Sequence, residues 1–291
     1  MQMVCMIRLN FILKAIFFAG SVQKESFLGL LTKQLFEEIK SLDSEKKLNF
    51  LKAMVKSLDE NEIQVFIDNQ VVAEKIADLG WDGSIYDGKC AIDNCLADYL
   101  FLVESNLGVN KANYFLYRNI DQVVDIGKKA ISRIVRVSYE NTAKSEAWPG
   151  GDYKNYMRVY LPSDVNISEL SIYDSDNPTT KKIFKMDELS IRLMDSKKEI
   201  GFLVMVPVGK KRTVEIHYLT SVDLTDKDSF SYLNYVQKQS GYGDTPIVSL
   251  ISFPEGWQPL QVQPAATLVG GKLLFNQKLS SDLKMGVEIS K

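Results

Sequence analysis

The sequence predicts an α+β protein, with a mixed α/β domain followed by an all-β sandwich of immunoglobulin-like architecture. Apolar residues keep a helical spacing only before residue 80. From residue 99 onward they mostly alternate with polar residues, and turn residues separate the alternating runs. The chain has 291 residues, of which 45% are hydrophobic and 25% charged, and these values are typical of a folded globular protein.

Three helices are expected in the first part of the chain. A spacing of three and four predicts one buried helix face made of Phe27, Leu30, Leu31, Leu35, Ile39 and Leu42. A second helix, capped by Asp43 or Ser44, carries the same spacing at Leu48, Leu51, Val55 and Leu58. A third is expected over 69–79, with Gly80 as its left-handed terminator. Between the last two, an alternating run predicts a strand at Ile63, Val65 and Ile67.

Strands expected near 99–103, 114–120 and 131–139 complete a mixed α/β domain over 21–143. The segment 144–152 carries Pro149, Gly150 and Gly151 without any apolar period, and is predicted as a linker. The β-sandwich domain is expected over 153–291, with strand-like runs at 156–161, 167–173, 189–194, 200–206, 212–219, 230–238, 246–253, 272–278 and 283–289. No cysteine lies past residue 95, so the immunoglobulin likeness is architectural only.

Residues 1–20 form an apolar leader that Arg8, Asn10 and Lys14 interrupt. A central charge is costly in a membrane helix, so a clean transmembrane span is disfavoured. Three interpretations stay open: a signal peptide or anchor remnant, an amphipathic helix packed on the domain, and the beginning of an incomplete gene product. No other segment of the sequence is apolar enough to span a membrane.

The net charge limits the kinds of partner that are expected, and the cysteines indicate the cellular compartment. The 35 basic and 37 acidic residues leave a net charge of −2, which gives no reason to expect nucleic acid as a partner. Cys90 and Cys95 are predicted to form a disulfide, which is typical of an oxidising, extracytoplasmic compartment. The alternative is a pair of free thiols in a reducing cytosol.

No catalytic motif is present, and neither a cofactor nor a metal is predicted. The single histidine, His217, is interpreted as a strand residue on a half-polar face, because no catalytic partner is recognised nearby. Asp82, Asp87, Asp93 and Asp98 do not have the spacing of a calcium loop. The aromatic run of Tyr153, Tyr156, Tyr160 and Tyr173 is either a glycan platform or an ordinary half-buried sheet face.

The loop over 104–118 supplies the predicted binding residues, which are Asn106, Lys111, Asn113 and Arg118. Amide and cationic groups between two apolar strands suit a sugar or a phosphate. The competing interpretation is structural, because asparagine and glycine favour tight connections in any loop.

Four segments occur in the order found in a bacterial family: LGWDGSI (79–85), ADYLFLVESNLGVNKANYFLYRNI (97–120), YKNYMRVYLPSDVNISEL (153–170) and YVQKQSG (235–241). They resemble the domain-of-unknown-function family numbered 4012 over roughly residues 25–255. The resemblance implies a bacterial envelope protein, tethered by an N-terminal membrane helix, with most of the chain outside the cytoplasm. The family's upstream part, which resembles LytR-type wall-polymer phosphotransferases, is not visible in this sequence. No catalytic residue is therefore carried over.

The expected function is a non-catalytic, extracytoplasmic module that binds or scaffolds an envelope component, such as a cell-wall glycan or another envelope protein. Membrane association is expected only through an N-terminal anchor. An alternative is a fragment of a LytR-like glycopolymer phosphotransferase, in which Lys111 and Arg118 bind phosphate. A third hypothesis is a cytosolic protein with free thiols at Cys90 and Cys95.

Overall fold

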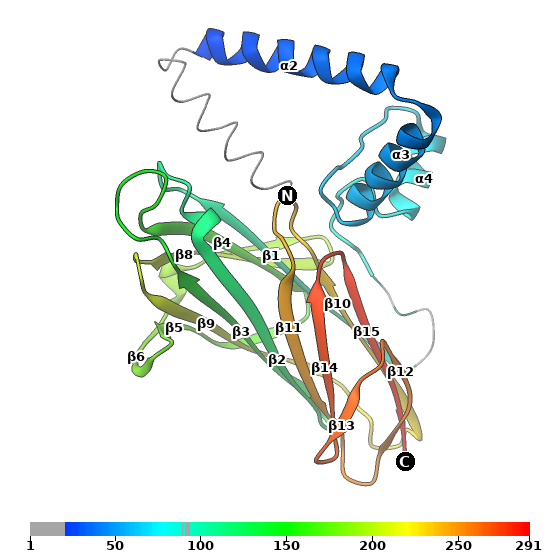
Figure 1. Cartoon of the computed structure of the whole chain (residues 1–291). Coiled ribbons are helices and arrows are strands. Elements are labelled where there is room, and N and C mark those ends of the chain that lie inside the picture. The colour runs from blue at the N-terminus through cyan, green and yellow to red at the C-terminus, as the bar shows by residue number, and fades with distance from the viewer. Residues whose placement is uncertain (1–20, 89, 91–93) are drawn as a thin grey trace. The chain divides into compact units, whose positions relative to one another are not determined.

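The computed structural model describes residues 21–88, 90 and 94–291 (Figure 1). The predicted leader at 1–20 lies outside these residues. The described chain is mostly β, with 49% strand, three α-helices and two mixed sheets, and this confirms the α+β class. It divides into two compact units, one made of the described residues up to Ser57 and the other of those from Leu58 to Lys291. Among the described residues, no helix has the length and apolarity that a membrane span requires.

The first unit contains α2 (Ser21–Ser41) and most of α3 (Ser44–Asp59). The second helix is capped as predicted, because the backbone N–H of Lys46 donates to Asp43 Oδ1 at 2.9 Å. The expected burial of the apolar faces is wrong. Leu30 and Leu35 in α2 and Leu48 in α3 are all more than half exposed, and no residue of α3 is buried. The spacing identifies a helix, but it does not say what covers its face.

The third predicted helix is confirmed as α4 (Gln70–Asp78). Asn69 caps its start by accepting from the N–H of Val72 at 3.2 Å, and Gly80 follows its end at φ +73°. The strand predicted at 63–67 is absent. That segment makes a backbone hydrogen bond from Val65 N–H to Trp81 O at 2.8 Å, but no neighbouring strand extends this contact into a ladder.

The seven-stranded sheet has the order β12-β15-β10-β1-β4-β8-β7. Its strands are β12 (Gln258–Gln263), β15 (Leu283–Ser290), β10 (Ser229–Gln237), β1 (Cys95–Asn106), β4 (Tyr153–Pro162), β8 (Lys197–Val206) and β7 (Ser190–Met194). All neighbours are antiparallel except β1 and β10, which are parallel.

The eight-stranded sheet has the order β13-β14-β11-β2-β3-β9-β5-β6. Its strands are β13 (Thr267–Val269), β14 (Lys272–Leu279), β11 (Thr245–Ser252), β2 (Leu116–Ile126), β3 (Ala130–Asn141), β9 (Lys211–Ser221), β5 (Asn166–Asp174) and β6 (Asn177–Ile183). Here β2 and β11 form the parallel pair. Two short 3₁₀ turns, η1 (Ala112–Phe115) and η2 (Met186–Glu188), lie in the connections.

The division into two domains at residues 144–152 is not what the structure shows, because strands from both predicted domains share the same sheets. The first three strands, which precede residue 144, are central members of the same two sheets that hold the later strands. The predicted linker at 144–152 therefore connects β3 to β4 inside one compact unit, and the boundary between units falls after Ser57 instead. Antiparallel sheets characterise the immunoglobulin sandwich, whereas both sheets here are mixed, so the structure supports the α+β class without the immunoglobulin arrangement.

The core consists of the alternate, inward-facing residues of both sheets. Large members such as Leu100 in β1, Val137 in β3 and Phe202 in β8 are at most 1% exposed. This burial follows from the period-2 pattern, because alternate residues on each strand face the same side of the sheet.

Two ion pairs are buried in this core, and both use β1. Asp98 lies 2.9 Å from Arg133 Nε in β3, and Glu104 lies 2.5 Å from Arg118 Nη1 in β2. All four side chains are at most 4% exposed. Burial alone would lower the pKa of Arg133, but the charge of Asp98 and the adjacent tyrosines outweigh it and raise that pKa. Each pair joins a strand of one sheet to a strand of the other.

Breaking one of these pairs is expected to destabilise the protein strongly. Arg133→Met leaves Asp98 charged and uncompensated, so the free energy of unfolding should fall by about 3–5 kcal/mol in urea denaturation. The matched control is Lys129→Met, which removes an exposed partner of Asp223 from the surface. The double variant Asp98→Asn/Arg133→Met should recover part of the loss. Equal losses for Arg133→Met and Lys129→Met would contradict the role given to the buried pair.

Candidate functional site

The predicted binding residues do not form one site. Asn106 is used inside its own loop, where Oδ1 accepts from Gly108 N–H at 2.9 Å and Nδ2 donates to Asn110 Oδ1 at 3.0 Å. Lys111 and Asn113 are exposed, and the backbone N–H of Lys111 donates to Pro149 O. These contacts shape the connection between β1 and β2, as the structural interpretation of the loop expects.

The side chain of Arg118 is buried in the core and does not reach the surface of this loop. Besides Glu104, its guanidinium contacts Thr245 Oγ1 at 3.0 Å and lies 3.8 Å from the ring centroid of Tyr242. Glu104 in turn accepts from the hydroxyls of Tyr153 and Tyr242, at 2.8 and 2.5 Å. Arg118 is therefore committed to an internal pair. The hypothesis that Lys111 and Arg118 together hold a phosphate loses its motivating geometry.

Two other predicted clusters are also dispersed. Asp98 faces the core, whereas Asp82 caps a local turn by accepting from Ser84 N–H, and Asp93 lies outside the described residues. Among the four tyrosines, Tyr153 is buried in the core, and the hydroxyl of Tyr160 donates to Glu199 Oε2. The remaining two lie on different sheets, Tyr156 in β4 and Tyr173 in β5. Together the four tyrosines make no common platform.

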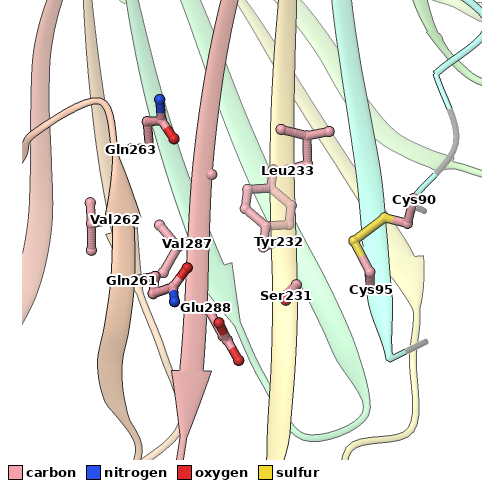
Figure 2. Close-up of a pocket in the computed structure, with 11 residues that line it drawn as sticks. Cys90, Cys95, Ser231, Tyr232, Leu233, Gln261, Val262, Gln263, Val287 and Glu288 are labelled. Carbon is pink, nitrogen blue, oxygen red and sulfur yellow. A yellow bond between two sulfur atoms is a disulfide. The ribbon is translucent and has the colours of Figure 1, made fainter. Parts of the chain in front are cut away.

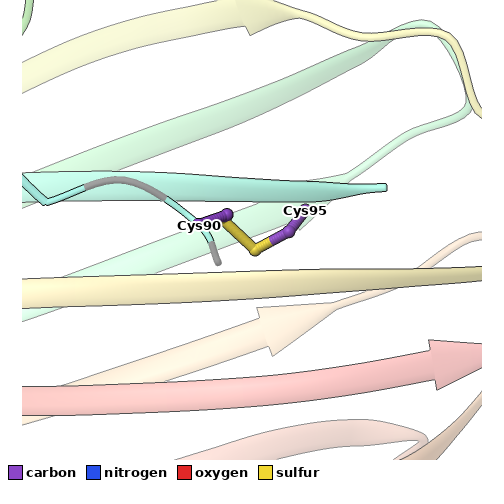
Figure 3. Close-up of a disulfide and its surroundings, with 2 residues drawn as sticks. All are labelled: Cys90 and Cys95. Carbon is purple, nitrogen blue, oxygen red and sulfur yellow. A yellow bond between two sulfur atoms is a disulfide. The ribbon is translucent and has the colours of Figure 1, made fainter. Parts of the chain in front are cut away.

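The predicted disulfide between Cys90 and Cys95 is confirmed (Figure 3). It joins the segment before β1 to the first residue of that strand. Nearby, the ring of Tyr86 stacks on Tyr235 of β10 at a centroid distance of 4.0 Å. The side chain of Gln237 accepts from Tyr86 N–H at 3.1 Å and donates to Ser84 O at 2.8 Å. Ser84 and Tyr86 are thus held on the outer face of the seven-stranded sheet.

An open groove of about 690 Å³ lies beside the disulfide (Figure 2). Its lining residues come from β12, β15, β10 and the disulfide: Cys90, Cys95, Ser231, Tyr232, Leu233, Gln261, Val262, Gln263, Gly286, Val287 and Glu288. The strand register explains how they meet. Gln261 pairs with Glu288, Glu288 with Ser231, and Ser231 with Cys95, so one polar row crosses four strands.

A second row creates the space above the sheet. Gln263 pairs with Gly286, and Gly286 with Leu233. Gly286 has no side chain to fill this space. An added Cβ would meet only the carbonyl oxygen of Gln263, at 3.9 Å. The groove therefore presents two side-chain amides, a hydroxyl and a carboxylate around a small apolar floor. Amides and hydroxyls both donate and accept hydrogen bonds, a combination that suits an uncharged polar ligand.

The sequence analysis did not identify these residues, because they meet only through the register of paired strands and share no sequence motif. The run KMGVE lies in the strand predicted at 283–289, whereas no strand is predicted for QPLQVQ (258–263), and nothing within either run indicates that Gln261 and Glu288 are neighbours. Pairing between strands that are distant in sequence is set by the whole sheet.

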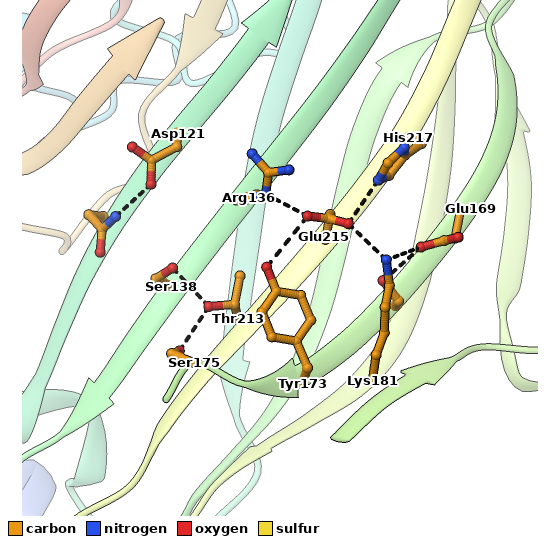
Figure 4. Close-up of polar contacts among 12 residues, drawn as sticks. Asp121, Arg136, Ser138, Glu169, Tyr173, Ser175, Lys181, Thr213, Glu215 and His217 are labelled. Atoms are coloured by element: carbon orange, nitrogen blue, oxygen red, sulfur yellow. Dashed lines mark hydrogen bonds and ion pairs between the residues drawn. The ribbon is translucent and has the colours of Figure 1, made fainter. Parts of the chain in front are cut away.

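A second polar cluster lies on the outer face of the eight-stranded sheet (Figure 4). Glu215 of β9 is its centre, with Arg136 Nε at 2.5 Å, His217 Nε2 at 2.8 Å and Lys181 Nζ at 2.9 Å. The sequence interpretation of His217 overlooked Glu215, which lies two residues earlier and hence on the same face of the strand. Burial opposes the charge on Glu215, but hydrogen bonds from His217, Lys181 and Arg136 outweigh it and lower the pKa to about 2.

The disulfide can be tested by counting thiols. The denatured protein should have two fewer reactive thiols before reduction than after it. The double variant Cys90→Ser/Cys95→Ser should lose at most about 2 kcal/mol of unfolding free energy, because the closed loop is short. Reducing the wild-type protein with dithiothreitol should produce the same loss. Equal thiol counts before and after reduction would contradict the disulfide.

The charge cluster predicts a specific acid response. The ordinary pKa of Glu215 is 4.5, and the folded value is about 2, so the unfolded chain binds more protons between these values. The stability that Glu215 contributes is therefore complete above pH 4.5 and is lost as the pH falls toward 2. Glu215→Gln should flatten the pH dependence of stability across that window, as measured by thermal melts. A variant with an unchanged slope would show that the cluster does not depress this pKa.

Comparisons with known proteins place the chain in no family. No model of a protein family matches the chain, and no curated protein sequence matches it. Among solved structures, one similar chain is a candidate nutrient binding protein from Legionella pneumophila. It has 8% sequence identity and a TM-score of 0.37, over 67% of this chain and 71% of that one. A TM-score this low does not establish a shared fold, so nothing is inferred from this likeness.

Proposed function

We propose that this protein is an extracytoplasmic binding module of the bacterial envelope, and that the groove beside the disulfide binds an uncharged sugar of the cell wall. The disulfide supports the compartment, because such bonds persist in oxidising environments. The resemblance to the family numbered 4012 supports the envelope assignment. The groove itself is the observation that carries the binding role.

The lining of the groove favours an N-acetylated sugar as the ligand. The side-chain amides of Gln261 and Gln263 can pair with acetamido groups, and the Ser231 hydroxyl and Glu288 carboxylate can pair with sugar hydroxyls. Leu233 supplies apolar surface between these groups. The carboxylate of Glu288 disfavours an anionic ligand through like-charge repulsion.

Filling the groove should abolish binding without disturbing the sheet. Gly286 does not have a positive φ, and there is room for a Cβ, so Gly286→Leu places an apolar side chain in the groove at little backbone cost. Chitotetraose is a suitable probe, since it consists of N-acetylglucosamine units. Isothermal titration should show binding to the wild-type protein and at least about tenfold weaker binding to the variant, a change of 1.4 kcal/mol.

A matched control is Gly243→Leu in the connection between β10 and β11, where a Cβ also meets nothing within 4 Å. This variant should bind chitotetraose as the wild type does. Diacetylchitobiose, which is uncharged, provides a second and shorter probe. If neither probe binds the wild-type protein, or if both glycine variants bind equally, the proposed function is wrong.

A further inference from the structure

The charge cluster on the eight-stranded sheet contains a set of metal-ligating atoms. Single ligand atoms of Glu169, Glu215 and His217 all lie within 4.8 Å of one another, and among the described residues these three side chains form such a group. Glu215 is 6% exposed, whereas the other two are half-buried and accessible from solvent. The cluster is on the other sheet from the groove and is independent of it.

The backbone brings the three side chains together in a defined way. Glu215 and His217 project from the same face of β9, because they are two residues apart. Glu169 pairs with His217 across β5 and β9, immediately after an irregularity in register between Ile167 and Glu169. A β-bulge of this kind re-aims side chains and is frequent beside functional sites. Without the shift in register, Glu169 would not lie opposite His217.

A lysine ammonium already lies among these oxygens. Lys181 Nζ is 2.6 Å from Glu169 Oε1 and 2.9 Å from Glu215 Oε1, so it bridges the two carboxylates (Figure 4). His217 Nε2 also contacts Glu215 Oε1. The second oxygen of Glu215, Oε2, is held by Arg136 Nε and by the hydroxyl of Tyr173. The ligand atoms that a metal needs therefore face Lys181, while Arg136 holds the opposite side of the carboxylate.

We propose that Glu169, Glu215 and His217 form a site for a divalent zinc ion, which binds by displacing the ammonium of Lys181. One imidazole nitrogen and two carboxylate oxygens are ligands that zinc accepts, and three protein ligands leave a fourth position for water. The imidazole of His217 favours a transition-metal ion such as zinc over magnesium or calcium, which prefer oxygen ligands alone. Arg136 stays on Oε2 and orients the Glu215 carboxylate, as outer partners of metal ligands commonly do.

Lys181 is well placed to leave. It belongs to β6, an edge strand in which every residue is exposed, and its side chain is 34% exposed while paired. Its long aliphatic stem can extend into water, where the ammonium is strongly hydrated. The exchange replaces one positive charge by two beside Glu169 and Glu215, so the carboxylates stay compensated. Lys181 thus competes with the metal for the same oxygens and weakens its binding.

The experiment titrates ZnCl₂ into the metal-free, untagged full chain and follows binding by calorimetry. The wild-type protein should bind one zinc ion. His217→Ala should weaken binding at least about tenfold, and Lys181→Ala should strengthen it by a similar factor, a change of 1.4 kcal/mol in each case. The matched control is Lys182→Ala, which removes the neighbouring lysine of the same strand, a partner of Glu188. Its zinc affinity should equal that of the wild type.

A second readout identifies the ligand directly. The chain has a single histidine, so the imidazole signals in a ¹⁵N-histidine-labelled sample belong to His217 without assignment. Zinc should shift the Nε2 resonance at one equivalent, and Glu169→Gln should reduce that shift. Absence of stoichiometric binding, an unmoved imidazole signal, or an unchanged affinity in Lys181→Ala would each overturn the proposal.

Discussion

Two buried ion pairs anchor β1 to the facing sheet, and the relation between the sheets depends on them. Asp98 and Glu104 lie on the same strand and point into the core, where Arg133 and Arg118 of the other sheet meet them. A charge in the core is tolerated only when its partner is in place, so each pair permits one alignment of β1 against β2 and β3. The groove and the charge cluster lie on the outer faces of the sheets that these pairs align.

Local structure was predictable wherever the cause is local. The presence of α4 near 69–79, its end before Gly80 and the alternation along β3 all follow from neighbouring residues. Strand partners were not predictable, because alternation reveals which face of a strand is buried and says nothing of the strand beside it. The assignment of residues 21–143 to a separate domain rested on that missing information. Since β1 pairs with β10, a distant strand places the early segment in the later sheet.

The candidate sites show the same division between local and long-range information. The Cys90–Cys95 disulfide was predictable, because its two ends are close in the sequence. Arg118 was predicted to be available for a ligand, because nothing in the sequence shows that it pairs with Glu104 at the other end of the loop. Gln261 and Glu288 became neighbours only through the pairing of β12 with β15. Glu215 was visible beside His217, but Lys181 and Glu169, which complete its surroundings, come from other strands.

The parallel pairs have a consequence for the order of folding. β1 needs β10, and β2 needs β11, so the partners are separated by more than a hundred residues of chain. During synthesis, the edge of β1 that faces β10 and the edge of β2 that faces β11 stay without these partners until residues 229–252 have emerged. Such long-range pairing slows folding and leaves unpaired strand edges open to aggregation in the meantime. Chaperone binding to the nascent chain is expected to persist until β11 is complete.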